Sequence, residues 1–249
     1  MLRIEATESD WKALDSARTV ATGGRWTRPD GKRFVWFAER DPEVLAAVCE
    51  ILAEGLPLYT IADAADRYTL VPLSAAGFVG DRYEHDWTLP VGTAADWSEE
   101  MLAAFEVGPP EQFDTAALRR FDDEIRDDSP GLHGWRWTAE AWATEHDHPS
   151  YDPALHPVAW DPAKRRFAGT VRVWMNPSGP RLGLVAAARP YRRTGLAAAL
   201  LARAFRVLRE RGHTEVRTEC DAANAASNAF LTKAGGQIVG GSIELVRHP

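Results

Sequence analysis

The chain has 249 residues, 45% of them hydrophobic and 26% charged, with a formal net charge of −7. This composition is typical of a globular protein and excludes disorder over most of the chain, and the acidic balance excludes bulk nucleic-acid binding. Cys49 and Cys220 are too few for a disulfide framework or a four-cysteine zinc site. No apolar run approaches about 18 residues and the first residues carry acids, so we expect a cytoplasmic protein with no membrane span and no secretory signal.

The first 92 residues alternate short apolar strands with helical stretches. Residues 33–38 and 58–62 are predicted as strands from their apolar and aromatic content. Residues 41–54 are predicted as a helix, because an acid and a proline begin the segment and Gly55 follows it where a C-cap belongs. Residues 93–114 are polar and contain Gly108-Pro109-Pro110, which indicates a linker between a domain at 1–92 and a second domain at 115–249.

The second predicted domain is a mixture of helices and strands. The pattern predicts helices at 115–126, 138–145, 196–211 and 225–234, and strands at 157–160, 167–175, 182–188, 216–220 and 243–246. The long helix has one apolar face, made by Ala197, Leu200, Leu201, Ala204 and Leu208. The fold class is therefore α/β, with a mixed sheet.

An internal repeat links the two halves of the chain. A shift of 158 residues aligns residues 58–87 with 216–245 without a gap, and the identical pairs include Asp63 with Asp221 and Gly77 with Gly235. Both segments are predicted as strand, helix, glycine and strand. The order of elements indicates two copies of one small unit.

The segment Ala187–Ala197 has the features of an anion site. A predicted strand ends in a turn with Arg192, Arg193 and Gly195, and the long helix begins at once. The first N–H groups of a helix have no partners and carry positive potential, and a glycine lets a phosphate come close to the backbone. The sequence therefore predicts a site for a pyrophosphate group.

The pattern at this site excludes two nucleotide-binding classes. Neither GxxxxGK[ST] nor a GxGxxG that follows a strand is present. What remains is Arg-x-x-Gly-x-Ala at 192–197, followed by Asn224 and, eleven residues later, Gly235. On these residues the region from 115 to 249 resembles the GCN5-related N-acetyltransferase (GNAT) family, which carries a Q/R-x-x-G-x-G/A signature between its fourth strand and third helix.

The resemblance implies an acyl-CoA N-acyltransferase fold that binds acetyl-CoA as cosubstrate and needs no metal. In the family the signature grips the pyrophosphate and the preceding strand pairs with the pantetheine arm. The implied cofactor-binding residues are Val185, Ala186, Ala187, Arg192, Arg193, Thr194, Gly195, Leu196, Ala197 and Asn224. For Asn224 a plain helix N-cap is an equally good interpretation.

The catalytic residues implied by the resemblance are fewer. Some members use a glutamate five residues before the conserved asparagine as the base, and Glu219 has that position here, although a solvent-facing strand residue is the alternative. The family often places a tyrosine as general acid where this chain has Leu231. Further acids on the acceptor side are Glu140, Glu145 and Asp147.

Two other groups of reactive residues are interpreted as structural. His146 and His148 are two residues apart, so on a helix they point in different directions, and the sequence offers no third metal ligand. Cys220 lies on a predicted strand with no nearby base, which favours a buried structural thiol over a nucleophile.

The first half of the chain resembles a degenerate acetyltransferase unit. Before its helix stand Glu39 and Asp41 where a pyrophosphate needs amides and positive charge, and Asp66 stands where the second half has Asn224. The whole chain thus resembles a tandem acetyltransferase with one working half. We expect acetyl transfer in a ternary complex to the amine of a small molecule or peptide, by a monomer or homodimer. A non-catalytic acyl-CoA sensor and an interaction scaffold that binds no CoA are the alternatives.

Overall fold

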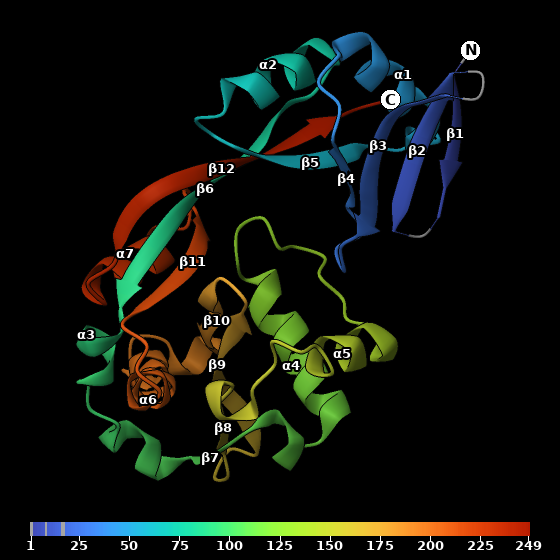
Figure 1. Cartoon of the computed structure of the whole chain (residues 1–249). Coiled ribbons are helices and arrows are strands. Elements are labelled where there is room, and N and C mark those ends of the chain that lie inside the picture. Colours follow the sequence, from blue (N-terminus) through green and yellow to red (C-terminus); the bar gives the residue numbers. More distant parts are fainter. Residues whose placement is uncertain (1, 8, 16–17) are drawn as a thin grey trace. The chain divides into compact units, whose positions relative to one another are not determined.

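The computed structural model describes residues 2–7, 9–15 and 18–249, which divide into two compact units (Figure 1). The first unit contains the residues up to His85 with Asp221–Ala223 and Gly240–Pro249, and the second contains Asp86–Cys220 with Asn224–Val239. Two long strands, β6 (Val79–Pro90) and β12 (Gln237–Arg247), contribute residues to both units. The units differ from the sequence boundaries because the C-terminal strand returns to the first unit.

The first unit is a sheet with two helices. Its elements are β1 (Leu2–Ala6), β2 (Asp10–Asp15), β3 (Arg18–Thr27), β4 (Arg33–Phe37), α1 (Pro42–Ala53), β5 (Leu58–Asp63) and α2 (Arg67–Ala75). β1 to β4 pair antiparallel in sequence order, β4 pairs with β5 in parallel, and β5 pairs antiparallel with β12. The predicted elements at 33–38, 41–54 and 58–62 are confirmed.

The first three strands were not predicted from the sequence. The glycine pair Gly23-Gly24 interrupts the apolar pattern of β3. The reason for Gly23 lies in the neighbouring strand, because a Cβ atom there would come within 2.0 Å of the Trp36 carbonyl oxygen. The close approach of β3 and β4 thus requires a glycine at position 23, and no local sequence pattern indicates this requirement.

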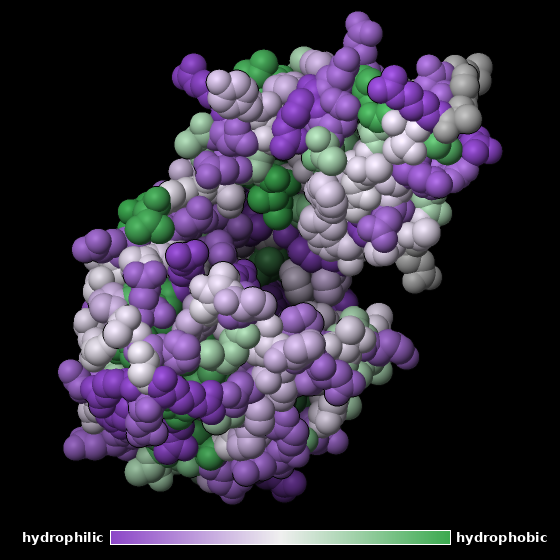
Figure 2. Space-filling model, viewed as in Figure 1, coloured by the Kyte–Doolittle hydropathy of each residue, from purple (hydrophilic) through white to green (hydrophobic). Residues whose placement is uncertain are grey.

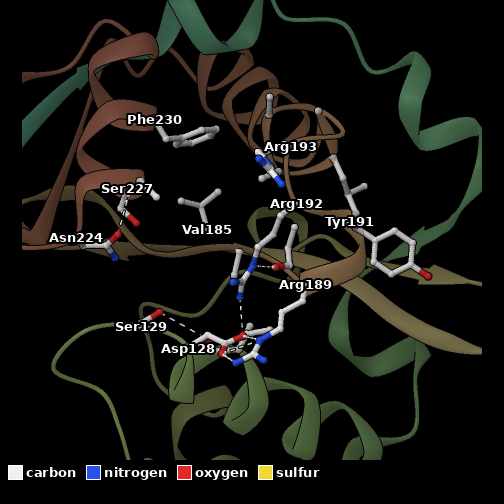
Figure 3. A pocket seen from close by; sticks show the side chains of 18 of the residues that line it. Asp128, Ser129, Val185, Arg189, Tyr191, Arg192, Arg193, Asn224, Ser227 and Phe230 are labelled. Carbon is white, nitrogen blue, oxygen red and sulfur yellow. Dashed lines mark hydrogen bonds and ion pairs between the residues drawn. The ribbon is translucent and has the colours of Figure 1, made fainter.

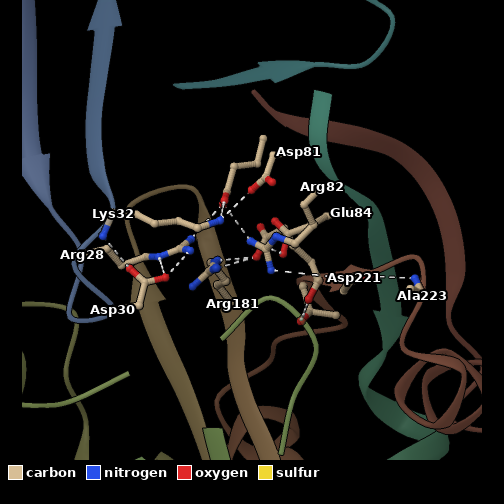
Figure 4. A network of polar contacts seen from close by, with 12 residues as sticks. Arg28, Asp30, Lys32, Asp81, Arg82, Glu84, Arg181, Asp221 and Ala223 are labelled. Carbon is tan, nitrogen blue, oxygen red and sulfur yellow. Dashed lines mark hydrogen bonds and ion pairs between the residues drawn. The ribbon is translucent and has the colours of Figure 1, made fainter. Parts of the chain in front are cut away.

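Charged side chains that include Arg28, Lys32, Asp81 and Arg82 form a polar network in the first unit (Figure 4). Glu244 on β12 is 2% exposed and accepts hydrogen bonds from Arg28 at 2.9 Å and Arg82 at 3.2 Å, and it also pairs with Lys32. Lys32 in turn pairs with Asp81 at 2.7 Å. A buried charge is tolerated only when it is paired and hydrogen-bonded, so these contacts hold the end of the chain against the β3–β4 hairpin.

The second unit has helices on a second set of strands. Its elements are α3 (Val91–Ala95), η1 (Glu100–Ala104), β7 (Glu106–Gly108), η2 (Pro110–Gln112), α4 (Thr115–Asp127), α5 (Ala139–His146), η3 (Pro153–Leu155), β8 (Val158–Asp161), β9 (Arg166–Asn176), β10 (Gly179–Ala187), η4 (Arg189–Tyr191), α6 (Leu196–Glu210), β11 (Glu215–Asp221) and α7 (Ala225–Lys233). β7 to β10 pair antiparallel in order, and β10 pairs with β11 in parallel. The helices and strands predicted between 115 and 246 are all present, with ends shifted by a few residues.

The segment 93–114, predicted as a linker, is structured. It carries the end of α3, η1, β7 and η2. The Arg206 guanidinium on α6 donates to the carbonyl oxygens of Ala95 at 2.9 Å and Trp97 at 2.6 Å. The segment therefore packs on the long helix of the second unit.

The predicted apolar face of α6 lies in the core of the second unit. The fully buried residues of this helix are Leu196, Ala199, Leu200, Leu201, Ala202, Ala204, Phe205 and Leu208. Gly169 on β9 lets the helix approach, because a Cβ there would come within 3.1 Å of Leu200 and 2.9 Å of the Ala186 carbonyl oxygen. Of the predicted face, Ala197 is half-buried and lines the site described below. Four further residues, Leu196, Ala199, Ala202 and Phe205, are buried although the prediction did not include them.

The internal repeat is confirmed element by element. α2 begins at Arg67 and α7 at Ala225, and β6 begins at Val79 and β12 at Gln237, so both pairs keep the shift of 158 residues. The side chains of Asp66 and Asn224 each cap their helix by accepting from the backbone N–H three residues on. The chain thus holds two copies of one fold.

The surface carries no large apolar area in the view of Figure 2, where apolar side chains form small separate groups among polar ones. Within the described ranges, no helix is long and apolar enough to cross a membrane.

Candidate functional site

The turn before α6 is built on two residues with left-handed backbones. Arg193 has φ +63° and Gly195 has φ +96°, and Gly195 is the N-cap of α6 without any side-chain cap. A β-carbon at 195 would meet no atom within 4 Å, so the backbone conformation and not space requires the glycine. The backbone of Arg193, which is not a glycine, has dihedral angles that such residues rarely adopt, a feature that is common at ligand sites.

The consequence of this turn is a set of N–H groups with no partner. Within the described part of the chain, the backbone N–H groups of Arg193, Thr194, Gly195 and Ala197 make no hydrogen bond. The Thr194 hydroxyl donates to the Tyr191 carbonyl oxygen at 2.7 Å, which fixes the turn. Unpartnered N–H groups at the start of a 15-residue helix suit a phosphate group.

Next to this turn, β10 and β11 separate. The two strands share one ladder pair among the described residues, Arg181 with Arg217, and the Thr218 hydroxyl adds a 2.7 Å bond to the Leu182 carbonyl oxygen. Beyond this point the register of β10 shifts between Leu182 and Leu184. A bulge bends the strand that carries it, and β10 still pairs with β9 from Leu184 to Ala187. The edge of β10 without a ladder partner there is the one toward β11.

Strand β10, the turn, the start of α6, helix α7 and the end of α4 line a cavity of about 750 Å³ (Figure 3). Nine of the ten cofactor-binding residues predicted from the sequence line this cavity, namely Val185, Ala186, Ala187, Arg192, Arg193, Gly195, Leu196, Ala197 and Asn224. Thr194 is the one predicted residue outside the lining of the described cavity. Sequence reasoning missed the contributions of Asp128, Ser227, Phe230 and Lys233, which come from α7 and the end of α4.

The charges in the cavity are arranged around one acid. Figure 3 shows the guanidinium groups of Arg189 and Arg192 turned to Asp128 at the end of α4. Arg192 donates to the Asp128 carboxylate at 2.6 Å and to the Ala187 carbonyl oxygen at 3.2 Å. Hydrogen bonds from Arg189 and then Arg192 lower the pKa of Asp128 to about 2.

The N-cap interpretation of Asn224 is confirmed, and its role in cofactor binding stays a prediction. Its Oδ1 accepts from the Ser227 N–H at 3.1 Å, so it is the N-cap of α7. It also lines the cavity beside Ser227 (Figure 3). The same residue thus shapes the helix and faces the site.

Glu219 lies at the sheet surface and outside the described cavity lining. Its neighbours Thr218 and Cys220 are buried, so Glu219 points to the opposite face of β11. There Arg181 binds its carboxylate through Nε at 2.8 Å and Nη2 at 2.5 Å, and the Glu219 side chain remains 32% exposed. Arg181 is the register partner of Trp174, so Glu219 lies on the face of the sheet that carries Trp174. Its role as base stays a prediction.

Leu231, at the position where the family often has a tyrosine, is 3% exposed and packs in the core of the second unit. The hydroxyl groups that line the cavity belong to Ser129, Tyr191 and Ser227. The Tyr191 hydroxyl donates to Asp161 at 2.7 Å, and the Ser129 hydroxyl donates to the Ile125 carbonyl oxygen at 3.4 Å.

The histidines of α5 and the segment after it are held by separate partners. His146 Nδ1 lies 2.8 Å from the Trp142 carbonyl oxygen, and His148 Nδ1 accepts from the Ser150 N–H at 3.1 Å. Across the described ranges, no group of three or more His, Cys, Asp and Glu side chains could hold a metal ion. Both cysteines are buried, and burial raises the pKa of Cys49 to about 12.

A buried polar cluster joins α4 to β9 and to the segment before α5 in the second unit. Asp122 on α4 is 1% exposed and accepts from Arg126 at 2.6 Å, Arg172 at 2.8 Å and the Trp137 indole at 2.7 Å. His156 is also 1% exposed, and its Nε2 lies 3.1 Å from the Val173 carbonyl oxygen. Burial, and next the charge of Arg172, lower the pKa of His156 to about 2.

His156 is expected to make the protein sensitive to acid. Its pKa in the unfolded chain is about 6.5, so below that pH the unfolded state binds a proton that the folded state does not. The contribution of His156 to the free energy of unfolding is complete above pH 6.5. It is lost as the pH falls from there toward 2, by about 1.4 kcal/mol per pH unit. Denaturant unfolding at a series of pH values measures this slope, and His156→Gln is expected to reduce it.

The matched control is His133→Gln, the same change at an exposed position of the same unit. Equal slopes for the wild type and His156→Gln would contradict a buried neutral imidazole.

The first unit has the corresponding turn, but its own carboxylates fill it. Asp41 accepts from the N–H groups of Glu43 at 2.9 Å and Val44 at 3.4 Å at the start of α1. Glu39 accepts from the N–H groups of Arg40 and Asp41 at 2.5 and 2.8 Å. The cavity beside this turn is about 210 Å³. Acids occupy the donors that a phosphate needs, which explains why this copy is degenerate.

Comparison with known proteins agrees with this geometry. Residues 98–236, more than half of the chain, match the Acetyltransferase (GNAT) family. A search of curated proteins finds no match.

Solved structures resemble this chain over nearly its whole length. A GCN5-related N-acetyltransferase from Sphaerobacter thermophilus aligns with TM-score 0.70 and 16% identity, over 98% of this chain and 82% of its own. A tandem GNAT protein from the clavulanic acid biosynthesis pathway aligns with TM-score 0.70 and 17% identity, over 96% and 82%. A GCN5-related N-acetyltransferase from Kribbella flavida aligns with TM-score 0.56 and 12% identity, over 99% of this chain and 89% of its own. At these identities the similarity shows the fold alone.

Proposed function

Because the chain belongs to the acetyltransferase (GNAT) family, we propose that it binds acetyl-CoA in the cavity of the second unit and transfers the acetyl group to an amine. The observation that carries the proposal is the set of unpartnered N–H groups of Arg193, Thr194, Gly195 and Ala197 beside a cavity of about 750 Å³.

The residues of the cavity fit the chemistry of acetyl-CoA. The N–H groups of the turn, with Arg192, Arg193 and Lys233, would hold the phosphate groups. The free edge of β10 at Val185–Ala187 would pair with the amides of the pantetheine arm, as an added strand does. When bound, acetyl-CoA supplies the thioester whose carbonyl carbon the amine attacks.

Glu219 is proposed to remove the proton of the acceptor ammonium. Its carboxylate lies at the point where β10 and β11 separate, beside the shared pair of Arg181 with Arg217. A neutral amine is required for attack, so a positioned carboxylate accelerates the step. Arg181 holds this carboxylate and fixes its orientation until the acceptor takes its place.

Glu219→Gln is expected to lower kcat by about 100-fold with a smaller change in the acetyl-CoA KM, because it removes the proton acceptor and leaves the cavity intact. Release of the CoA thiol measures turnover. The control is Glu215→Gln, four residues earlier on the same exposed face of β11. If Glu219→Gln keeps wild-type kcat at every pH, another group or a water molecule is the base.

The buried Leu231 favours a second candidate function, a sensor that binds acyl-CoA without turnover, since no tyrosine can protonate a leaving thiolate there. One experiment separates the candidates. Calorimetric titration with acetyl-CoA and free CoA is followed by a screen of small-molecule and peptide amines with thiol release as readout. Micromolar binding with turnover supports the enzyme and binding without turnover supports the sensor. Absence of binding at millimolar ligand overturns both.

A further inference from the structure

The acid Asp128 has an unexpected place in the cavity. It is the sole Asp or Glu among the described residues that line it, whereas Arg189, Arg192, Arg193 and Lys233 supply positive charge. Its side chain is 13% exposed, although the Arg189 and Arg192 side chains that bind it are 74% and 44% exposed. The carboxylate therefore lies inward and the arginines reach over it from the mouth.

The position of Asp128 is not explained by helix stability. It is the C-cap of α4, where the helix dipole disfavours a negative charge. It accepts no capping bond from the helix. Its partners are Arg189, through Nε at 2.9 and 3.0 Å, and Arg192, through Nη2 at 2.6 Å. Its contacts in the folded chain are thus with the arginines of the phosphate-binding turn.

Asp127, the preceding residue, gives a direct comparison. It pairs with Arg136 at 2.6 Å and accepts from the Gly134 N–H at 2.9 Å. These contacts stabilise the loop that follows α4, and Asp127 is not part of the described cavity lining. Of two adjacent carboxylates, one holds the loop and the other occupies the anion site.

We propose that Asp128 competes with the phosphate groups of the ligand for Arg189 and Arg192, and so sets both the affinity for acyl-CoA and its dependence on salt. This inference rests on the proposed function. When the cavity is empty, the carboxylate neutralises part of the positive charge at the turn. A phosphate that binds the N–H groups of the turn also needs the guanidinium groups of Arg189 and Arg192. It can pair with them only if their ion pairs with Asp128 break, and otherwise the Asp128 carboxylate repels it.

The contrary arrangement predicts the opposite result. If Asp128 and the Ala187 carbonyl oxygen hold Arg192 in the orientation that binds phosphate, then loss of the carboxylate weakens binding. Competition predicts tighter binding on loss of the same charge. The sign of the change therefore decides between the two.

The test is calorimetric titration of the full chain with CoA, comparing the wild type with Asp128→Asn and with the matched control Asp127→Asn. Competition predicts that Asp128→Asn binds CoA about 5-fold more tightly at low ionic strength, and that the gain shrinks as salt rises through about 0.15 M. Pantetheine, which has the same arm without phosphates, is the second probe and its affinity is expected to stay unchanged. Melting temperatures establish that both variants fold.

Several outcomes would overturn the inference. Unchanged or weaker CoA binding by Asp128→Asn contradicts competition, and so does an equal gain in Asp127→Asn or for pantetheine, because either shows a general charge effect. These results leave the proposed function standing when the wild type binds CoA. If neither the wild type nor any variant binds CoA, the proposed function fails and the inference fails with it.

Discussion

Replacing Arg192 by Glu is expected to weaken acetyl-CoA binding by about 100-fold, equivalent to about 3 kcal/mol. The change removes a guanidinium from the cavity and places a second carboxylate beside Asp128, so a phosphate meets repulsion where it now meets a forked donor. Calorimetry measures the affinity, and far-UV circular dichroism checks the fold. The control is Arg209→Glu, the same reversal at the other end of α6, where the exposed Arg209 pairs with the exposed Asp96.

A second variant tests the backbone of the same turn. Gly195→Val places a β-branched residue at φ +96°, a strain of about 1–3 kcal/mol that is relieved by turning the N–H groups away from the cavity. A β-carbon there meets no neighbouring atom within 4 Å, so we expect the fold to persist while binding is lost. If CoA binds both Arg192→Glu and Gly195→Val as it binds the wild type, the ligand site lies elsewhere in the chain.

Asp122→Asn is expected to lower the free energy of unfolding by about 3–5 kcal/mol, the largest stability effect predicted for this protein. Asp122 is the carboxylate shared by Arg126, Arg172 and the Trp137 indole. Removing its charge leaves two nearly buried guanidinium groups without a counter-charge, at 8% and 5% exposure. The arginines, with Trp137, lower the pKa of Asp122 to about 2 despite its burial, so the carboxylate is ionised at neutral pH.

Guanidinium unfolding curves measure this loss. The control is Asp123→Asn, because the half-buried Asp123 accepts a single backbone bond from the Trp137 N–H at 3.0 Å, which an asparagine oxygen can also accept. A loss below about 1 kcal/mol for Asp122→Asn would show that Arg126 and Arg172 find water or other partners.

Much of the fold could be predicted because its signals are local. The apolar face of α6, the Asp41 cap of α1 and the glycine at 195 depend on residues within one or two turns of the chain. Helical periodicity, capping and left-handed backbone act over that range, so a sequence shows them. The repeat was also visible, since both copies keep the same spacing between cap, helix and glycine.

The first three strands and the role of 93–114 could not be predicted in the same way. β3 contains two adjacent glycines because of a neighbouring strand, and 93–114 is polar although it packs on α6. The ends of the compact units likewise follow β6 and β12, whose residues are shared. These features depend on pairing between distant segments, which leaves no local period in the sequence.

The sequence by itself thus determined the tandem acetyltransferase fold, the turn at Arg192–Ala197 and the residues that line one side of the cavity. The tertiary structure alone decided that Asp128 pairs with Arg189 and Arg192, since the Asp128–Arg192 pair joins residues 64 positions apart. It also decided that Arg181 holds Glu219 and that Leu231 is buried in the core. The physical reason is range: a turn is specified by the stereochemistry of neighbouring residues, whereas an ion pair exists only where the fold brings its two charges together.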